Sequence, residues 1–293
     1  MNKRYIDLKV TEGTYVPPVT IDYPEDDPYV GLYKPVYDRD FPAVDTTYPY
    51  FDESVWHRFR SWCGYTFLLR PLGWVLRIKY GLRWKIEGEE GWSRSSCGVR
   101  RWLKQFDLSR GAITIANHCY RHDCASVLTA IHASYHTRIP MFAPNFRTKD
   151  QTFLSLVGGV PIPELEGGFG ALKAFNNAFD EYNKLGYWFH IFPEAKRWDW
   201  YKPLRPFQKG AFTMAYKYNK PIIPFAVTYR PRTGLWRLFG PAEEPLTQVV
   251  IGKPIYPDMS RSRATEIERL LEETHETICR LAGIEHNTWP SSL

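Results

Sequence analysis

From residue 82 onward, short apolar runs alternate with longer segments of helical periodicity, and this alternation constrains the fold more than any other feature. The runs have the length and the β-branched residues of buried strands. They lie at residues 82–87, 112–116, 140–144, 160–163, 187–192, 222–229 and 248–252. The helical patterns lie at residues 122–136, 148–156, 168–185, 207–219 and 261–283. Because strands and helices alternate, we expect an α/β fold with a mostly parallel sheet covered by helices on both faces.

Two segments precede this region, so we expect three parts. Residues 1–52 are rich in proline, tyrosine and acidic residues and show no sustained period, which predicts an extended arm along the body or a second subunit. Residues 53–81 are rich in Trp, Phe, Leu and Arg, and Pro71 predicts two short helices with a break. These helices suit a membrane interface, and packing against the core is the alternative. Residues 82–293 form the α/β domain.

Composition narrows the cellular setting. The five cysteines are odd in number and include no Cys-x-x-Cys pair, which favours a reducing compartment over a disulfide framework. The first residues, MNKRYIDLKVTEG, lack the apolar core of a secretory signal. No uncharged apolar run reaches the roughly 18 residues needed to span a bilayer. We therefore expect a cytoplasmic protein that is peripheral on the cytoplasmic face of a membrane.

The net charge of +6 is unevenly distributed, because residues 1–52 are acidic and the remainder is strongly basic. A basic body suits anionic partners such as membrane surfaces or phosphates, and a solvated basic surface without a partner is the alternative. The basic residues are not gathered into a recognised nucleic-acid-binding module, so we expect no nucleic-acid partner.

A histidine and an aspartate follow the run at 112–116, where a buried strand would end. His118 would lie in the turn, and Asp123 in the first turn of the next helix. The carboxyl edge of an open α/β sheet is where ligands bind. A carboxylate that accepts a hydrogen bond from one ring nitrogen leaves the other nitrogen free to take a proton from a hydroxyl. His118 and Asp123 are therefore candidate catalytic residues, with a structural His–Asp hydrogen bond as the alternative.

The run at 187–192 also ends in charged residues. Glu194 and Arg197 follow it closely and would emerge at the same edge of the sheet, where an acidic and a basic group could hold a polar substrate. Lys209 opens a later helix, and a helical amino terminus with a lysine is a ready anion site. The alternatives are a salt bridge that supports the loop and a solvated lysine.

Residues 118–124 permit two other chemistries. Cys119, His122 and Cys124 could bind zinc with His118, but four ligands within seven residues make a poor tetrahedral site. Cys119 could instead be a nucleophile, although a neighbour in the turn need not face the imidazole. We expect neither a metal nor another cofactor.

Taken in order, these blocks resemble the glycerolipid acyltransferase superfamily, which includes lysophosphatidic acid and glycerol-3-phosphate acyltransferases. The similar blocks are Asn117-His118-x4-Asp123, Phe192-Pro193-Glu194-x-x-Arg197, Phe207-x-Lys209-Gly210-Ala211 and Pro221-Ile222-Ile223-Pro224. The resemblance covers about residues 82–255 and implies that His118 is the general base, that Asp123 orients it, and that the Phe-Pro-Glu block contacts the acceptor. It also implies membrane association through an amino-terminal helical segment.

Two blocks depart from the family pattern. The third block is usually Phe-Pro-Glu-Gly-Thr-Arg-Ser, and here it is FPEAKRW, in which Arg197 keeps its place. In the second block, Glu164 stands where the family has an arginine that helps to hold the acceptor phosphate. This change argues against a phosphomonoester acceptor, unless Lys196 or Lys209 compensates.

The resemblance implies transfer of a fatty acyl group from acyl-CoA or acyl carrier protein to the hydroxyl of a lysophospholipid such as 1-acylglycerol-3-phosphate. In this reaction the thioester is a co-substrate, and the membrane surface is a partner. A catalytically impaired acyltransferase-like protein that binds lipid or acts as a scaffold is the alternative, because the second and third blocks are altered.

Overall fold

The computed structural model describes residues 7–18, 21–24, 26–30, 44–147, 151–163 and 168–293. A seven-stranded sheet with the order β2-β8-β7-β3-β6-β4-β5 lies at the centre of the protein. Its strands are β2 (Arg83–Ile86), β3 (Ile113–Ala116), β4 (Thr137–Phe142), β5 (Gly159–Ile162), β6 (Trp188–Ile191), β7 (Ile222–Arg230) and β8 (Leu246–Ile251). Strands β3 to β7 are parallel, and β8 and β2 run the opposite way. The mostly parallel sheet expected from the sequence is confirmed.

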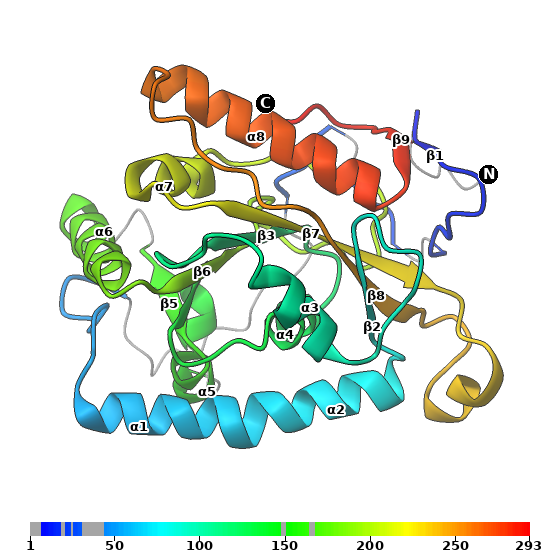
Figure 1. Ribbon diagram of the computed structural model, residues 1–293, viewed down its shortest axis with the longest axis horizontal. Coiled ribbons are helices and arrows are strands. Elements are labelled where there is room, and N and C mark those ends of the chain that lie inside the picture. Colours follow the sequence, from blue (N-terminus) through cyan, green and yellow to red (C-terminus); the bar gives the residue numbers. More distant parts are fainter. Residues whose placement is uncertain (1–6, 19–20, 25, 31–43, 148–150, 164–167) are drawn as a thin grey trace.

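Helices cover both faces of this sheet. On β3, Ile113 and Ile115 face one hydrophobic layer and Ala112 and Ala116 face the other, because side chains alternate along a strand. The first layer is covered by α6 (Gly168–Lys184), α7 (Gly210–Tyr218) and α8 (Arg263–Leu281). The second is covered by α3 (Ser96–Leu103) and α4 (Asp123–Ala130). Figure 1 shows α7 and α8 above the sheet and α3 and α4 below it.

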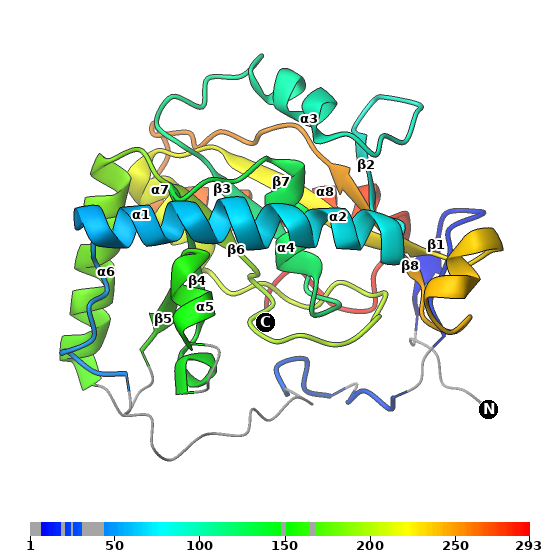
Figure 2. The same ribbon diagram turned by 90° about the horizontal axis from the view of Figure 1, so that it is seen from below.

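Below α4 lies a helical rod that forms a further layer (Figures 1 and 2). It consists of α1 (Val55–Cys63), the π-helical segment η1 (Gly64–Leu69) and α2 (Arg70–Lys79). Gly73 allows close packing, since a Cβ there would lie 2.8 Å from Cγ2 of Thr129 on α4. The outer side of the rod exposes large apolar residues: Val55, Trp56, Phe59, Trp62, Phe67, Leu68, Trp74, Val75 and Ile78.

The expected break at Pro71 is wrong. Pro71 lies in the first turn of α2, and the helical path is continuous from α1 through η1 to α2. A proline inside a helix lacks an N–H and crowds the carbonyl four residues earlier, and the wider π-helical turn before it provides the space. Within the described residues, no helix combines the length and the apolar character required to cross a bilayer.

The smaller elements lie around the edges. A two-stranded antiparallel sheet joins β1 (Lys9–Val10) to β9 (Ile284–His286), and this pairing ties the arm to the carboxyl-terminal end of the chain. The others are η2 (Ala143–Arg147), α5 (Gln151–Leu156) and η4 (Gly234–Phe239). Helix α4 is shorter than its predicted range, because the backbone leaves the helix at His132, which has φ of 57°.

Candidate active site

The loop after β3 emerges at the middle of the sheet, between the loops that follow β7 and β6. Asn117 fixes it there. Its amide nitrogen donates to the carbonyl of Val227 at 2.9 Å, and its amide oxygen accepts from the Val227 N–H at 2.7 Å. The side chain thus continues the sheet pairing beyond the end of β3 and sets the position of His118. The sequence places Asn117 directly before His118 in the first motif, and this position is the signal for its role.

His118 and Asp123 are brought together as the sequence predicts. Nδ1 of His118 lies 3.4 Å from Oδ2 of Asp123, and the carboxylate is fully buried. The same oxygen accepts hydrogen bonds from the backbone N–H groups of Cys119 at 2.5 Å and Tyr120 at 2.6 Å. The His118 ring stacks on Phe192, with centroids 4.1 Å apart, and 24% of its side chain is exposed. Asp123 and Phe192 therefore orient the imidazole and leave Nε2 as the nitrogen that faces outward.

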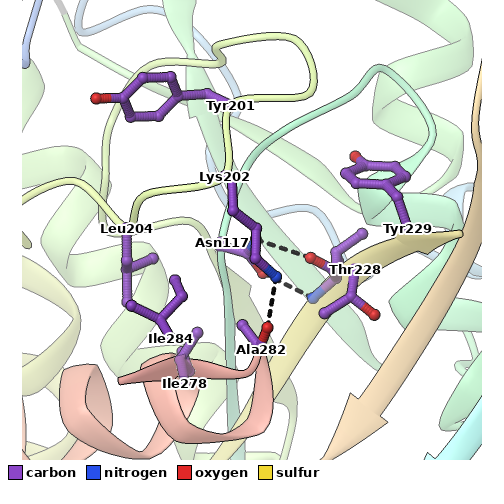
Figure 3. A pocket seen from close by; sticks show the side chains of 10 residues that line it. Asn117, Tyr201, Lys202, Leu204, Thr228, Tyr229, Ile278, Ala282 and Ile284 are labelled. Atoms are coloured by element: carbon purple, nitrogen blue, oxygen red, sulfur yellow. Dashed lines mark hydrogen bonds between the residues drawn. The ribbon is translucent and has the colours of Figure 1, made fainter. Parts of the chain in front are cut away.

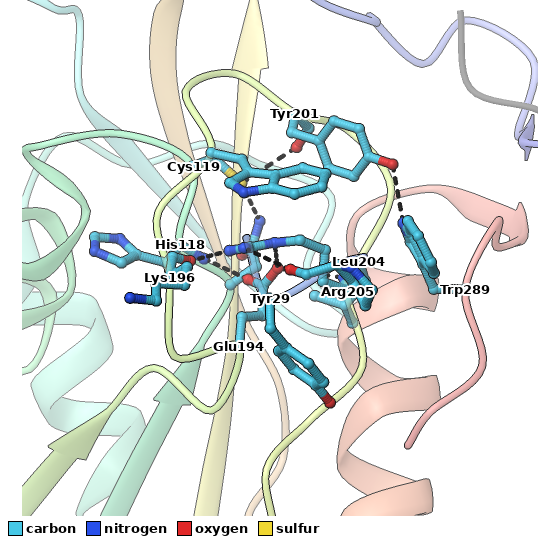
Figure 4. A network of polar contacts seen from close by, with 12 residues as sticks. Tyr29, His118, Cys119, Glu194, Lys196, Tyr201, Leu204, Arg205 and Trp289 are labelled. Carbon is cyan, nitrogen blue, oxygen red and sulfur yellow. Dashed lines mark hydrogen bonds and ion pairs between the residues drawn. The ribbon is translucent and has the colours of Figure 1, made fainter. Parts of the chain in front are cut away.

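Glu194 connects this loop to the loop after β6. Its Oε1 accepts the backbone N–H of His118 at 2.6 Å, and its Oε2 accepts Nε of Arg205 at 2.9 Å. The side chains of Glu194 and Arg205 are almost completely buried, and Glu194 is 2% exposed. The structure thus brings Glu194 to the histidine and directs its carboxylate toward the protein interior (Figure 4).

The other three predicted binding residues lie in different surroundings. Nε of Arg197 lies 2.8 Å from Oδ1 of Asp199, and the Arg197 side chain is half-buried near the His118 loop. The ammonium of Lys196 lies 4.5 Å from the ring centroid of Phe142, at the carboxyl end of β4. Lys209 instead donates to Glu268 of α8 at 2.6 Å and is mostly exposed. Arg197 and Lys196 therefore flank the histidine loop, whereas Lys209 is held on α8.

The region that carries this geometry matches a known family: residues 86–228 fit the model described as Acyltransferase. Residues 86–228 are an acyltransferase domain. The resemblance seen in the sequence is confirmed at this level. A search of solved structures found the 1-acyl-sn-glycerophosphate (LPA) acyltransferase PlsC from Thermotoga maritima. It is 16% identical, with 80% of this chain and 90% of that chain covered, and a TM-score of 0.49. No curated protein matches the sequence.

Arg205 of the acyltransferase domain was not predicted, and it organises the loop that follows β6. Its guanidinium donates to the carbonyls of Lys196 and Pro28 as well as to Glu194, and it lies 4.8 Å from the Trp198 ring centroid. Figure 4 shows the His118 ring pointing away from this network. The one signal in the sequence is an arginine within an otherwise apolar, proline-flanked stretch at 203–206.

The amino-terminal arm packs on the same loop of the acyltransferase domain. Tyr23 stacks on Trp198 with centroids 4.8 Å apart, and the Trp198 indole N–H donates to the Val30 carbonyl at 2.7 Å. Ala195, where the family usually has glycine, has φ of 62°. This left-handed conformation costs an L-residue about 1 kcal/mol, so the surrounding contacts hold the loop in place.

Burial dominates the electrostatics of His118 and Asp123. It lowers the pKa of His118 to about 3, with Glu194 opposing the shift and Arg197 adding to it, so the imidazole is neutral at neutral pH. Burial raises the pKa of Asp123 to about 8, against the backbone N–H groups of Tyr120 and Cys119, which lower it. The second carboxylate oxygen, Oδ1, is buried and has no hydrogen-bond partner within the described residues.

The two alternative chemistries at this loop are not supported. Burial raises the pKa of the Cys119 thiol well above its ordinary value, and Sγ lies 3.3 Å from the Tyr201 carbonyl, so the reactive thiolate is disfavoured. In the part of the chain that the structure describes, no group of three or more His, Cys, Asp or Glu side chains is placed to bind a metal ion.

A small cavity lies behind the histidine loop, on the side of Asn117 (Figure 3). Its volume of about 10 Å³ holds about one water molecule. Lys202 lines it, donates to the Ala282 carbonyl, and has its pKa lowered to about 8 by burial. This cavity cannot hold an acyl chain. Phe142 and Ile162 are exposed apolar side chains at the carboxyl edge of the sheet.

Proposed function

We propose that this protein transfers a fatty acyl group from acyl-CoA or acyl carrier protein to the hydroxyl of a lysophospholipid such as 1-acylglycerol-3-phosphate. The observation that carries the proposal is the His118 ring, which Asp123 and Phe192 orient and whose side chain is 24% exposed at the carboxyl edge of the sheet. A neutral imidazole placed in this way can accept a proton from an alcohol.

In the proposed reaction, Nε2 of His118 removes the proton from the acceptor hydroxyl while the oxygen attacks the thioester carbonyl. The C–O bond forms, the C–S bond breaks, and the departing thiolate takes the proton back from the imidazolium. Asp123 keeps the Nδ1 proton in place and stabilises the positive charge on the ring during the transfer. The products are the acylated lipid and the free thiol, and no covalent enzyme intermediate is needed.

Different side chains would hold the two substrates. Arg197 and Lys196 lie beside the histidine loop and supply positive charge for the polar headgroup of the acceptor. The acyl chain would lie along Phe142 and Ile162 at the ends of β4 and β5, on the edge to which His118 also belongs. Glu194 would act by fixing the backbone of His118, because its carboxylate is occupied by Arg205.

The rod of α1, η1 and α2 would place this edge at a membrane. It exposes five aromatic side chains, Trp56, Phe59, Trp62, Phe67 and Trp74, and such residues bind at the interface of a bilayer. The five cysteines are all free thiols, which agrees with a reducing compartment and with attachment to the cytoplasmic face.

The test is thioester-dependent acylation of a panel of lysolipids by the wild type and by His118→Ala. Loss of the general base should lower kcat/KM by about 10²- to 10⁴-fold. His286→Ala, which removes an exposed histidine from β9, is the matched control and should retain full activity. Activity that survives His118→Ala would exclude the proposed base. A wild type without turnover on any acceptor would favour a lipid-binding or scaffold protein.

A further inference from the structure

Three arginines gather at the edge of the sheet formed by β2, β8 and β7, apart from the His118 loop. The isolated antiparallel bridge between Trp84 and Ser93 places Arg83 on β2 near Arg94. Arg94 and Arg230, at the end of β7, both stack on the indole of Trp236, with guanidinium carbons 4.9 and 4.7 Å from the ring centroid. We call Arg83, Arg94 and Arg230 the arginine trio.

Among the described residues, no acidic side chain pairs with the arginine trio. Within the same residues, Nε of Arg230 is buried without a hydrogen-bond partner. Burial, Arg83 and Arg94 together lower the pKa of Arg230 to about 10. The neighbouring Arg232, by contrast, is paired with Glu244. Arginine side chains gathered without an acidic partner can bind an anion.

The loop that carries Trp236 is strongly apolar on its outer side. In η4, Leu235 is 77% exposed and Leu238 is 79% exposed, and Phe239 is exposed beside them. These side chains face solvent instead of packing in the core. The ring of Trp236 between them packs against Arg94 and Arg230. An exposed apolar tip next to cationic side chains is the arrangement found in segments that enter the headgroup region of a bilayer.

This tip lies beside the end of the helical rod. The guanidinium of Arg232 donates to the Lys79 carbonyl at the end of α2 at 3.0 Å and to the Trp236 carbonyl in η4 at 3.1 Å. In both Figure 1 and Figure 2, η4, drawn in gold, lies beyond the carboxyl-terminal end of α2. The exposed apolar residues of α2 and η4 therefore belong to neighbouring segments.

We infer that η4 and the arginine trio form a second lipid-contact site, in which the arginines bind the phosphate of an anionic phospholipid and Leu235 and Leu238 enter the bilayer interface. The occupant is a membrane, because its phosphates would pair with the trio, its apolar interior would take up the leucines, and the site lies beside the exposed aromatic residues of the rod. The site lies apart from the His118 loop and does not depend on acyl transfer.

The experiment is co-sedimentation of the full chain with vesicles of phosphatidylcholine alone and of phosphatidylcholine mixed with phosphatidylglycerol. Arg94→Gln should weaken binding to the mixed vesicles about fivefold, the effect of one cation at an anionic surface, and should not alter binding to phosphatidylcholine. Leu235→Ser with Leu238→Ser should weaken binding to both. Arg263→Gln, an exposed arginine at the start of α8 on the opposite face of the sheet, should bind as the wild type does.

Wild-type binding by Arg94→Gln, or by the double leucine variant, would overturn the inference. Inorganic phosphate that competes fully with the vesicles at millimolar concentration would also overturn it, because the trio would then be a site for a soluble anion. Trp56→Ser with Phe59→Ser tests the α1 face separately. The η4 variants should retain full acylation of a short-chain, monomeric lysolipid, so loss of vesicle binding and loss of the proposed activity are measured independently.

Discussion

Two groups of charged side chains in this protein are arranged in opposite ways. Beside His118, the buried Glu194 and Arg205 lie 2.9 Å apart, and backbone groups take up their remaining hydrogen bonds. Beside Trp236, the arginine trio has no acidic partner among the described residues. A charge that the protein itself compensates fixes a loop in place, whereas charges gathered without a partner are available to a ligand.

The largest expected effect of pairing the charges within the protein is on the free energy of unfolding. Glu194→Ala leaves Arg205 buried without its carboxylate and should lower the free energy of unfolding by about 3–5 kcal/mol, measured by denaturant titration. Glu268→Ala removes the exposed pair with Lys209 and should cost less than about 1 kcal/mol. The double variant Glu194→Ala with Arg205→Met should recover most of the loss, because no buried charge remains. A double variant as unstable as the single one would contradict this account of the pair.

The second expected effect is a difference in pH dependence between kcat/KM and vesicle binding. The proposed reaction needs Asp123 ionised, and burial raises its pKa to about 8, so kcat/KM should fall about tenfold per pH unit below that value. Arg230 of the trio stays protonated over the same range, because its pKa is about 10. Vesicle binding should therefore remain constant where acylation falls. A flat rate profile between about pH 6 and 8 would exclude Asp123 as the titrating group.

The smallest expected effect concerns repulsion within the trio. Salt screens like charges, so raising the ionic strength should stabilise the wild type relative to Arg94→Gln by roughly a few tenths of a kcal/mol. Denaturant titration of both proteins at low and physiological salt measures this difference, with Arg263→Gln as the reference. An identical salt response of the wild type and Arg94→Gln would show that the trio carries no net repulsion.

Much of the sheet could be predicted because its signals are local. The run from Ala112 to Ala116 and the one from Ile222 to Tyr229 are short, apolar and β-branched, and the alternation of strands and helices favours parallel pairing. The break expected at Pro71 was wrong for an equally physical reason. Whether a proline ends a helix depends on how the preceding turn adjusts, and here η1 widens to accommodate it.

Only part of the candidate site could be predicted from the sequence. His118 and Asp123 lie five positions apart and meet through one turn, so their pairing follows from local geometry. The expectation that rested on Glu164 lies outside the described residues. Lys209 matched a family block, yet its side chain is held by Glu268, which belongs to a helix distant in the sequence. A motif specifies residue types at a spacing, and it does not specify which distant side chain will bind them.

The sequence by itself determined the α/β class, the place of the histidine loop at the end of a central strand, and the pairing of His118 with Asp123, because strand period and turn length act over a few residues. Only the tertiary structure decided that Glu194 turns inward to Arg205 and that Arg83 and Arg94 lie near Arg230. Those contacts depend on the order of strands in the sheet and on the path of long loops. Their energies arise from burial and from charges brought together across the whole chain.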